Sequence, residues 1–461
     1  MIFVGLFLSF ILGFSVISAV SHRFSLPEKL GMSFIIGVGI QTLLMAILDL
    51  LSIPLTITSI FIFSFIILLA ALFFCHKTKN ELINEFKSFS FRHINCKQYM
   101  VILWLIVLIA VGYIEFLNWE KCVYFPTFDR DSIVGFDFMG RVIAHEHKMG
   151  LSGYFTGEYS FLGNKGASYT HYTPFVHLSY AYVYLLGAET SKMINALFFL
   201  SFIITFYAAL RNKITPTLAI SATLFTLLVP EFTAFSSMSA TNVLHATYAS
   251  LAVIYAWLFF NTNQKRYFGL MIILSALNIW TRQEGIVFIA AIACMLLIKA
   301  VKNKPFKKLL VIYSVLTVLP FIYWLVYLKI FNLGSQSESM NLMPFWDANK
   351  FNTIREMTWW LLSNTTYYSL TFIVFGLAIL ASLFFMIKKR TNYELPGMFL
   401  ISLLCFCILV YQIEYNWDSL ENVMNYSCKR FLFCFVPIAW AFTFTNPLME
   451  KVNDWFNKML Q

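Results

Sequence analysis

The stretch between residues 119 and 174 holds most of the side chains in this sequence that could do chemistry. It stands between long apolar runs, and charged groups are costly in lipid, so its polar side chains must lie in water or line a cavity at the membrane surface. Loops of this length usually carry function as well as connect helices. Its carboxylates, guanidinium groups and imidazoles include Asp129, Arg130, Asp131, Asp137, Arg141, His145, Glu146, His147 and His171.

Asp131 is a candidate general base. It stands just before apolar residues at helical spacing, so its side chain could cap the first turn of that helix. It could instead take a proton from an acceptor hydroxyl at the membrane surface. Asp129, two residues earlier, could share this site or hold a divalent cation together with Asp131. Both interpretations stay open at the level of sequence.

The histidines at 145 and 147 do not predict a metal site. On a helix, residues i and i+2 point to different sides, so both imidazoles would not reach one ion. The sequence also has no Cys-x-x-Cys or Cys/His spacing typical of zinc. His171 precedes Tyr172-Thr173-Pro174, where the proline restricts the entry into the next helix. His171 is therefore a candidate for substrate binding.

Further cations interrupt the apolar sequence later in the chain. The turn Thr281 to Gly285 places Arg282 and Glu284 between two apolar stretches, where each needs a partner. The two could simply pair and pin the helix ends. Two more basic residues enter the last apolar span at the same predicted level, and arginine binds phosphate through two parallel hydrogen bonds. The cations that could converge on a phosphate are Arg130, Arg141, Arg282, Lys429 and Arg430.

The composition is typical of a membrane protein. Of 461 residues, 59% are hydrophobic and only 12% are charged, against roughly 25% in soluble domains. The mean hydropathy of +0.72 and many apolar runs of about 20 residues indicate transmembrane helices. The net charge of +10 could suggest nucleic acid, but no soluble stretch is long enough to form a basic domain. A bias of positive charge toward the cytoplasmic loops explains the excess.

We predict an all-α polytopic membrane protein with about thirteen transmembrane helices and a long extracytoplasmic loop that carries amphipathic juxtamembrane helices. A short amphiphilic helix is expected at 175–187. The organisation comprises an N-terminal three-helix extension with a basic loop (1–98), a catalytic membrane module (99–446) with its outside loop (118–174), and a tail (447–461). The predicted spans are 2–21, 30–51, 55–75, 99–117, 190–210, 214–230, 242–260, 267–281, 285–300, 307–330, 367–387, 395–413 and 431–446.

The positive-inside rule orients these spans. One alternation places most of the Lys and Arg on one face, with the N-terminus outside and the C-terminus inside. The loop 118–174 then shares the extracytoplasmic face with segments 332–364 and 414–430. Cys122 and Cys428 belong to two of these outside segments, where an oxidising compartment would allow a disulfide between them.

In this order, the motifs resemble those of the GT-C superfamily, polytopic glycosyltransferases that use polyprenyl-phosphate-linked sugars. The protein O-mannosyltransferases and the aminoarabinose transferases of lipid A belong to this superfamily. An acidic residue, Asp131, opens an amphipathic helix in the first large outside loop, and Tyr172-Thr173-Pro174 resembles the Tyr-Pro-Pro element that closes it. The turn Thr281 to Gly285 and Arg430 before an aromatic-rich last span complete the set. The resemblance covers about 99–446.

The resemblance implies that Asp131 is the base of an inverting transfer, with Asp129 and Asp137 as alternatives. Candidate donor-phosphate contacts are Arg282, Arg430, Lys429, Arg141 and Arg130, and candidate substrate contacts are His171, Tyr172, Glu284 and His245. The sequence departs from the family at two points. Where the family often has an Asp, the comparable position here is Asn242, which weakens a metal-dependent version. The element Tyr172-Thr173-Pro174 also lacks the first of the two prolines.

The predicted function is transfer of a sugar from a polyprenyl-phosphate donor to an extracytoplasmic glycan, lipid or protein. No GxGxxG or Walker pattern occurs, so no nucleotide site is expected. A divalent cation, Mg²⁺ or Mn²⁺, is the one cofactor left open. The alternatives are an O-antigen-type polymerase or ligase and a transporter or flippase of lipid-linked sugars, although transporters usually place polar groups at the bilayer midplane. The abundance of Phe, Lys, Asn and Ile favours a bacterial inner membrane.

Overall fold

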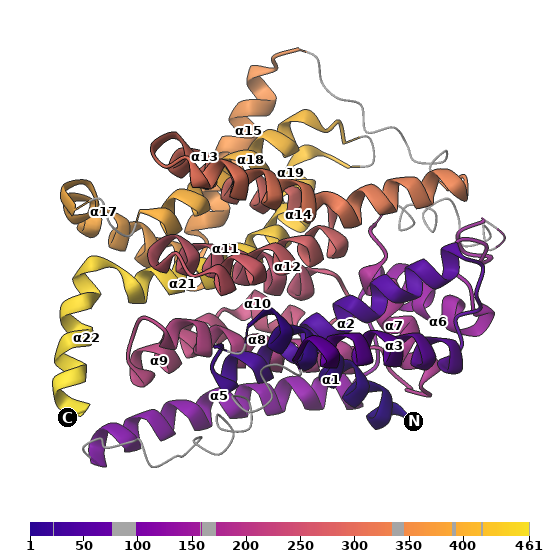
Figure 1. Ribbon diagram of the computed structural model, residues 1–461. Coiled ribbons are helices and arrows are strands. Elements are labelled where there is room, and N and C mark those ends of the chain that lie inside the picture. Colours follow the sequence, from indigo (N-terminus) through magenta and orange to yellow (C-terminus); the bar gives the residue numbers. More distant parts are fainter. Residues whose placement is uncertain are drawn as a thin grey trace.

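The computed structural model of the protein describes residues 1–21, 23–75, 98–156, 158, 172–333, 345–389, 393–415 and 418–460. Throughout these ranges the regular elements are helices and no strand forms, which confirms the all-α polytopic fold. The long apolar helices lie beside one another in a bundle (Figure 1).

Eleven segments of the described chain are long and apolar enough to cross a membrane. Ten of them are α1 (Ile2–Val20), α2 (Leu26–Leu50), α3 (Ile57–Cys75), α5 (Gln98–Tyr124), α8 (Lys192–Arg211), α11 (Asn242–Thr262), α13 (Ile286–Lys302) together with the turn η6 (Gln283–Gly285) that runs directly into it, α14 (Pro305–Ile330), α17 (Thr371–Lys389) and α18 (Glu394–Gln412). The eleventh is a run of consecutive helical turns from Leu420 to Thr445. It consists of α19 (Leu420–Val423), η7 (Met424–Cys428), α20 (Lys429–Phe431), η8 (Leu432–Cys434) and α21 (Phe435–Thr445).

Two of the predicted spans form helices that are too short to be counted with these eleven. α9 (Pro216–Leu227) has 12 residues and α12 (Lys265–Thr281) has 17. At 1.5 Å per residue they extend about 18 and 26 Å, whereas the hydrocarbon core of a bilayer is about 30 Å thick. The predicted number of thirteen spans is therefore not confirmed.

Shorter helices occupy the connections between the spans. The helix predicted at 175–187 is present as α7 (Phe175–Leu185). The amphipathic helix predicted after Asp131 is also present, as a π-helical turn that continues into an α-helix. The remaining short helices are η3 (Asp131–Phe136), α6 (Asp137–Glu146), α10 (Pro230–Phe235), η6 (Gln283–Gly285), α15 (Ala348–Ser363), α16 (Thr365–Tyr368) and α22 (Pro447–Leu460).

The N-terminal helices pack deeply into the rest of the bundle. The backbones of α1 and α2 approach so closely that a Cβ at Gly13 would lie 1.8 Å from the carbonyl oxygen of Ser33. Glycine permits this contact because small residues let membrane helices pack backbone to backbone. On its other sides α2 accepts hydrogen bonds from α11 and α12: Tyr248 Oη donates to the carbonyl oxygen of Ile35 at 2.6 Å, and Trp280 Nε1 donates to Thr42 Oγ1 at 3.1 Å.

The buried end of α2 also anchors the loop that carries the candidate site. Asp49 accepts hydrogen bonds from the backbone amides of Met149 at 2.7 Å and Gly150 at 3.0 Å. It accepts a third from the hydroxyl of Tyr327 on α14. His147 ends α6 in the left-handed conformation, at φ 58°, and its ring contacts a backbone carbonyl just before α3 at 3.2 Å. His147 thus helps to hold the loop in place.

Candidate functional site

An ion pair joins Asp131 and Arg430 across 299 positions of the sequence. Arg430 Nη1 donates to Asp131 Oδ2 at 2.7 Å, and the two side chains are 20% and 32% exposed respectively. The pair links the first residue of η3 to α20, so a helix within the loop 118–174 meets the last of the described spans. This contact brings together the predicted base and one of the predicted phosphate ligands.

π-helical turns stand next to both partners of this ion pair. η3 begins at Asp131, and η7 (Met424–Cys428) ends two residues before Arg430. The backbone carbonyl of Tyr426 in η7 accepts a hydrogen bond from Arg430 Nε at 3.0 Å. A π turn is rare and costs regular helix geometry, and such turns occur frequently at functional sites. Here they direct two opposite charges toward each other.

A second ion pair forms within the turn between α12 and α13. Arg282 Nη2 lies 2.6 Å from Glu284 Oε1, and its Nε donates to Oε2 at 3.3 Å. Arg282 Nη1 donates to Asn242 Oδ1 at 3.1 Å at the start of α11. Burial lowers the pKa of the Arg282 guanidinium, but the Glu284 carboxylate and Tyr172 outweigh it and raise the pKa above its usual value. The guanidinium is therefore a permanent cation.

Tyr172 stands between the two ion pairs. Its ring lies 5.6 Å from the guanidinium carbon of Arg282, and its hydroxyl is within electrostatic range of Glu284, Asp131 and Arg430. Burial raises the pKa of this hydroxyl, and Arg282 lowers it in part. The phenol stays protonated at neutral pH and can donate a hydrogen bond. Tyr172 of the Tyr-x-Pro element therefore lies near Arg282, Asp131 and Arg430.

A third ion pair involves Lys429, the residue before Arg430. Its ammonium lies 3.2 Å from Glu231 Oε1 and 4.2 Å from the centre of the Tyr367 ring. Glu231 belongs to α10 and was not predicted. Its position directly after Pro230, at the outside end of a predicted span, is the signal that could have identified it. We call Asp131, Tyr172, Glu231, Arg282, Glu284, Lys429 and Arg430 the outer cluster.

The outer cluster pairs each of its three cations with a carboxylate. The side chains come from five separate segments of the chain, and the sequence placed all of these segments on one face of the membrane. A bound phosphate would have to compete with these carboxylates for the cations. Arg430 uses Nε and Nη1 in the bonds described, so its Nη2 can serve a ligand. The arrangement suits an anionic group that arrives next to a base.

His245 lies behind this cluster and is only 1% exposed. Its Nδ1 is 3.4 Å from Cys434 Sγ, and its ring packs 5.6 Å from that of Phe431. It is within electrostatic range of Arg282 and Glu284. The buried His245 ring therefore packs near the Arg282 pair, and its role in substrate binding stays a prediction. The other predicted histidine contact, His171, lies outside the described residues.

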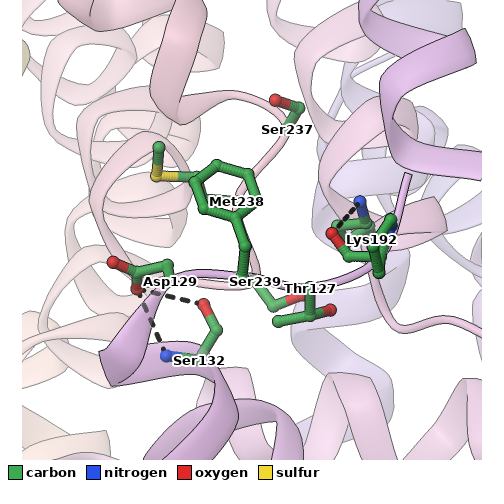
Figure 2. A pocket seen from close by; sticks show the side chains of 9 residues that line it. Thr127, Asp129, Ser132, Lys192, Ser237, Met238 and Ser239 are labelled. Atoms are coloured by element: carbon green, nitrogen blue, oxygen red, sulfur yellow. Dashed lines mark hydrogen bonds between the residues drawn. The ribbon is translucent and has the colours of Figure 1, made fainter.

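Asp129, and not Asp131, caps the helix. Asp129 Oδ2 accepts hydrogen bonds from the backbone amide and the hydroxyl of Ser132, both at 3.2 Å. This corrects the capping role considered for Asp131, whose carboxylate turns instead to Arg430. Asp129 borders a crevice that is too narrow to hold a water molecule, and Figure 2 shows Asp129 and Lys192 on opposite sides of it. The neighbouring Arg130 is exposed.

Asp137 and Arg141 belong to a different polar network. Asp137 accepts from Arg141 Nε at 3.0 Å and from the hydroxyls of Tyr184 and Ser191, each at 2.5 Å. Ser191 Oγ contacts Ser239 Oγ at 2.9 Å. This network ties α6 to α7, to the start of α8 and to the segment before α11. The structure does not bring Asp137 or Arg141 into the outer cluster.

The predicted disulfide is wrong. Cys122 and Cys428 are both free thiols, and both are buried. Cys122 lies near the end of α5, where its sulfur is 4.0 Å from the carbonyl oxygen of Ser236. Cys428 is the last residue of η7. Both cysteines were predicted on the same face of the membrane, which made a disulfide possible, but the structure holds them as two separate buried thiols.

The described residues form no protein ligand set for a divalent cation. Within these ranges, no three His, Cys, Asp or Glu side chains gather closely enough to hold a metal ion. Asp129 caps Ser132 and Asp131 pairs with Arg430, so the two carboxylates considered for a shared cation have different partners. The dependence of the protein on Mg²⁺ or Mn²⁺ stays an open question for experiment.

Part of the chain is similar to a known protein family. Residues 175–324, from α7 to the middle of α14, match a family model described as dolichyl-phosphate-mannose-protein mannosyltransferase. The matched region contains Arg282 and Glu284 but neither Asp131 nor Arg430. No curated protein and no solved structure matches the chain significantly.

Proposed function

We propose that this protein, whose resemblance to the GT-C glycosyltransferases is confirmed by the family match, transfers a sugar from a polyprenyl-phosphate donor to an extracytoplasmic acceptor. The match supports a membrane glycosyltransferase with a lipid-linked donor, and it favours an enzyme over a transporter or flippase. Asp131 as the base, the inverting course, the outside location of the site and the bacterial inner membrane are parts of the proposal.

The observation that carries the proposal is the ion pair of Asp131 with Arg430 beside Tyr172 and Arg282. A lipid-linked donor keeps its chain in the bilayer and its phosphate at the membrane surface. Cations at helix ends are therefore needed there, because charge is costly deeper in the lipid. An acceptor hydroxyl arriving from water needs a base at the same level. The outer cluster offers both within one set of contacts.

In the proposed reaction the donor phosphate first competes with Asp131 for the Arg430 guanidinium. Asp131 Oδ2 is then released to accept the proton of the acceptor hydroxyl. The acceptor oxygen attacks the anomeric carbon from the side opposite the phosphate, and the bond between that carbon and the phosphate oxygen breaks. Polyprenyl phosphate leaves with the electron pair. Arg430, Arg282 and Lys429 stabilise the charge that grows on it, because charge-assisted hydrogen bonds strengthen as charge develops.

The test compares Asp131→Asn with Asp129→Asn in the purified full chain reconstituted in lipid vesicles. Turnover is measured by mass spectrometry against a panel of polyprenyl-phosphate sugars and membrane extracts as acceptors. Asp131→Asn should lose about 10²–10⁴-fold in rate, the usual value of a general base. Asp129→Asn should keep turnover, since asparagine also caps helices well. Near-normal turnover in Asp131→Asn, with a loss in Asp129→Asn, would contradict the assignment.

Analysis of the same reaction products distinguishes the proposed function from the remaining alternatives. Transfer of one sugar fits the proposal, whereas transfer of a whole oligosaccharide would indicate a polymerase or ligase. Movement of a lipid-linked sugar across the vesicle membrane without any transfer would indicate a flippase.

A further inference from the structure

We propose that a second cavity, beside the outer cluster, binds a neutral carbohydrate as the acceptor. The binding itself is independent of the proposed function, and only the role as acceptor rests on it. The cavity has a volume of about 490 Å³ and is open to solvent. Sites for small molecules typically have 300–1,000 Å³. It is lined by Asp347, Asn349, Lys350, Thr353, Glu414, Tyr415 and Leu420.

The cavity lies between α15 and the segment that follows α18, and Figure 1 shows α15 rising beside α18 and α19. Two contacts hold its walls together. Lys350 Nζ donates to the carbonyl oxygen of Ile413 at 2.6 Å and lies 5.6 Å from the centre of the Tyr411 ring. The backbone amide of Asp347 donates to Tyr411 Oη at 2.6 Å. The site is therefore preformed by bonds across two segments of the chain.

An exposed aromatic platform stands at the rim. Trp346 is 70% exposed although it stacks on Tyr411, with ring centres 5.4 Å apart and an angle of 29° between the planes. It directly precedes Asp347 of the cavity wall, and the preceding Phe345 is 79% exposed. The face of an aromatic ring is electron-rich, and the C–H face of a pyranose is weakly positive, so the two attract. A large exposed ring beside polar side chains is typical of sugar binding.

The polar groups of the wall match sugar hydroxyls. At the start of α15, the backbone amides of Asn349 and Lys350 both donate to Asp347 Oδ1, so Asp347 Oδ2 can accept a hydrogen bond from a ligand. Asn349, Thr353 and the half-buried Glu414 add amide, hydroxyl and carboxylate groups that donate or accept. Two carboxylates and one ammonium make the wall negative overall. This charge repels phosphate headgroups and favours a neutral sugar.

The cavity adjoins the outer cluster. Tyr415 lines the cavity and lies within electrostatic range of Glu284 and Cys428. α15 packs on η7, the π turn that precedes Lys429 and Arg430. A saccharide held by Trp346 could thus extend toward Asp131, and its far end would present the hydroxyl that is glycosylated.

Saturation-transfer NMR on the full chain in nanodiscs tests the inference without a donor. The probes are neutral trisaccharides of glucose, mannose and N-acetylglucosamine, together with a Ser/Thr-rich peptide. At least one trisaccharide should bind, and Trp346→Ala and Glu414→Gln should each weaken binding about tenfold or more, which corresponds to about 1.4 kcal/mol. Trp359→Ala is the matched control, because Trp359 is 74% exposed on α15 but stands six residues beyond Thr353, the last residue of α15 in the cavity wall, whereas Trp346 directly precedes Asp347 of that wall.

The inference would be overturned if none of the trisaccharides binds, if all variants bind equally well, or if only the peptide binds. Asp131→Asn should keep saccharide binding, so this variant separates the inference from the proposed function. Saccharide binding without sugar transfer by the wild-type chain would remove the proposed function, and with it the role as acceptor, but would leave the binding site. If Trp346→Ala transfers sugar to the acceptor at the wild-type rate, the carbohydrate site is wrong and the proposed function stands.

Discussion

Replacing Arg430 by glutamine should damage catalysis far more than stability. The change removes the cation that holds Asp131 at 2.7 Å and that we assign to the donor phosphate. Glutamine keeps a polar side chain of moderate length but carries no charge. The two consequences can be estimated separately, since one concerns the folded protein and the other the transition state.

The loss of stability follows from the geometry of the pair. Two unit charges about 4 Å apart attract by about 4 kcal/mol at an effective dielectric constant of 20. Because the side chains are 20% and 32% exposed, solvent screening reduces this to about 1–2 kcal/mol. The effect on the transition state is larger. Removing one preorganised donor to developing charge typically costs about 2.7 kcal/mol or more, which is about 100-fold in rate.

The assay measures kcat/KM for sugar transfer together with thermal unfolding in matched nanodiscs. Arg430→Gln should lose about 100-fold in kcat/KM, whereas Arg430→Lys should fall in between because it keeps the charge but not the fork of donors. Arg355→Gln is the control, since Arg355 pairs with Glu356 on the exposed surface of α15. The reasoning would be refuted by wild-type kcat/KM in Arg430→Gln, or by an equal loss in the control.

Two further outcomes follow from the described contacts. Asp137→Asn should lower the free energy of unfolding by about 2–3 kcal/mol, because Asp137 accepts hydrogen bonds from three donors. The folded fraction should keep its kcat, since this network lies outside the outer cluster. Loss of kcat at unchanged stability would contradict this expectation. Burial of the His177 ring lowers its pKa to about 3. Between pH 6.5 and 3 only the unfolded chain therefore takes up the proton. As the pH is lowered through this range, the free energy of unfolding decreases by up to about 1.4 kcal/mol per pH unit. His177→Phe should remove this part of the acid sensitivity in thermal unfolding at pH 7 and pH 5, and an unchanged pH dependence would contradict the assignment.

The segments that carry the site could be found from the sequence. The outside loop, the turn at Arg282 and the basic residues before the last span all interrupt apolar runs, and the positive-inside rule placed them on one face. The pairing of Arg282 with Glu284 was among the alternatives, because the two residues are neighbours in one turn. The hydrogen bonds from Ser132 to Asp129 were not predicted, because only Asp131 was considered as the cap of this helix.

The other pairs could not be found in this way. Lys429 meets Glu231 across 198 positions and Arg430 meets Asp131 across 299, and hydropathy carries no information on which helix ends touch. The same limit applies to the cavity beside α15, whose walls come from two segments, and to the expected disulfide between Cys122 and Cys428.

The sequence by itself determined that the chain is a bundle of membrane helices and that its charged residues stand mostly at the ends of those helices, because each charged residue is costly to place in lipid. Only the tertiary structure decided which charge faces which. Helix packing and two π turns orient Asp131 toward Arg430 and withdraw Asp137 into a separate network. Such choices depend on contacts between distant segments, and local patterns do not encode them.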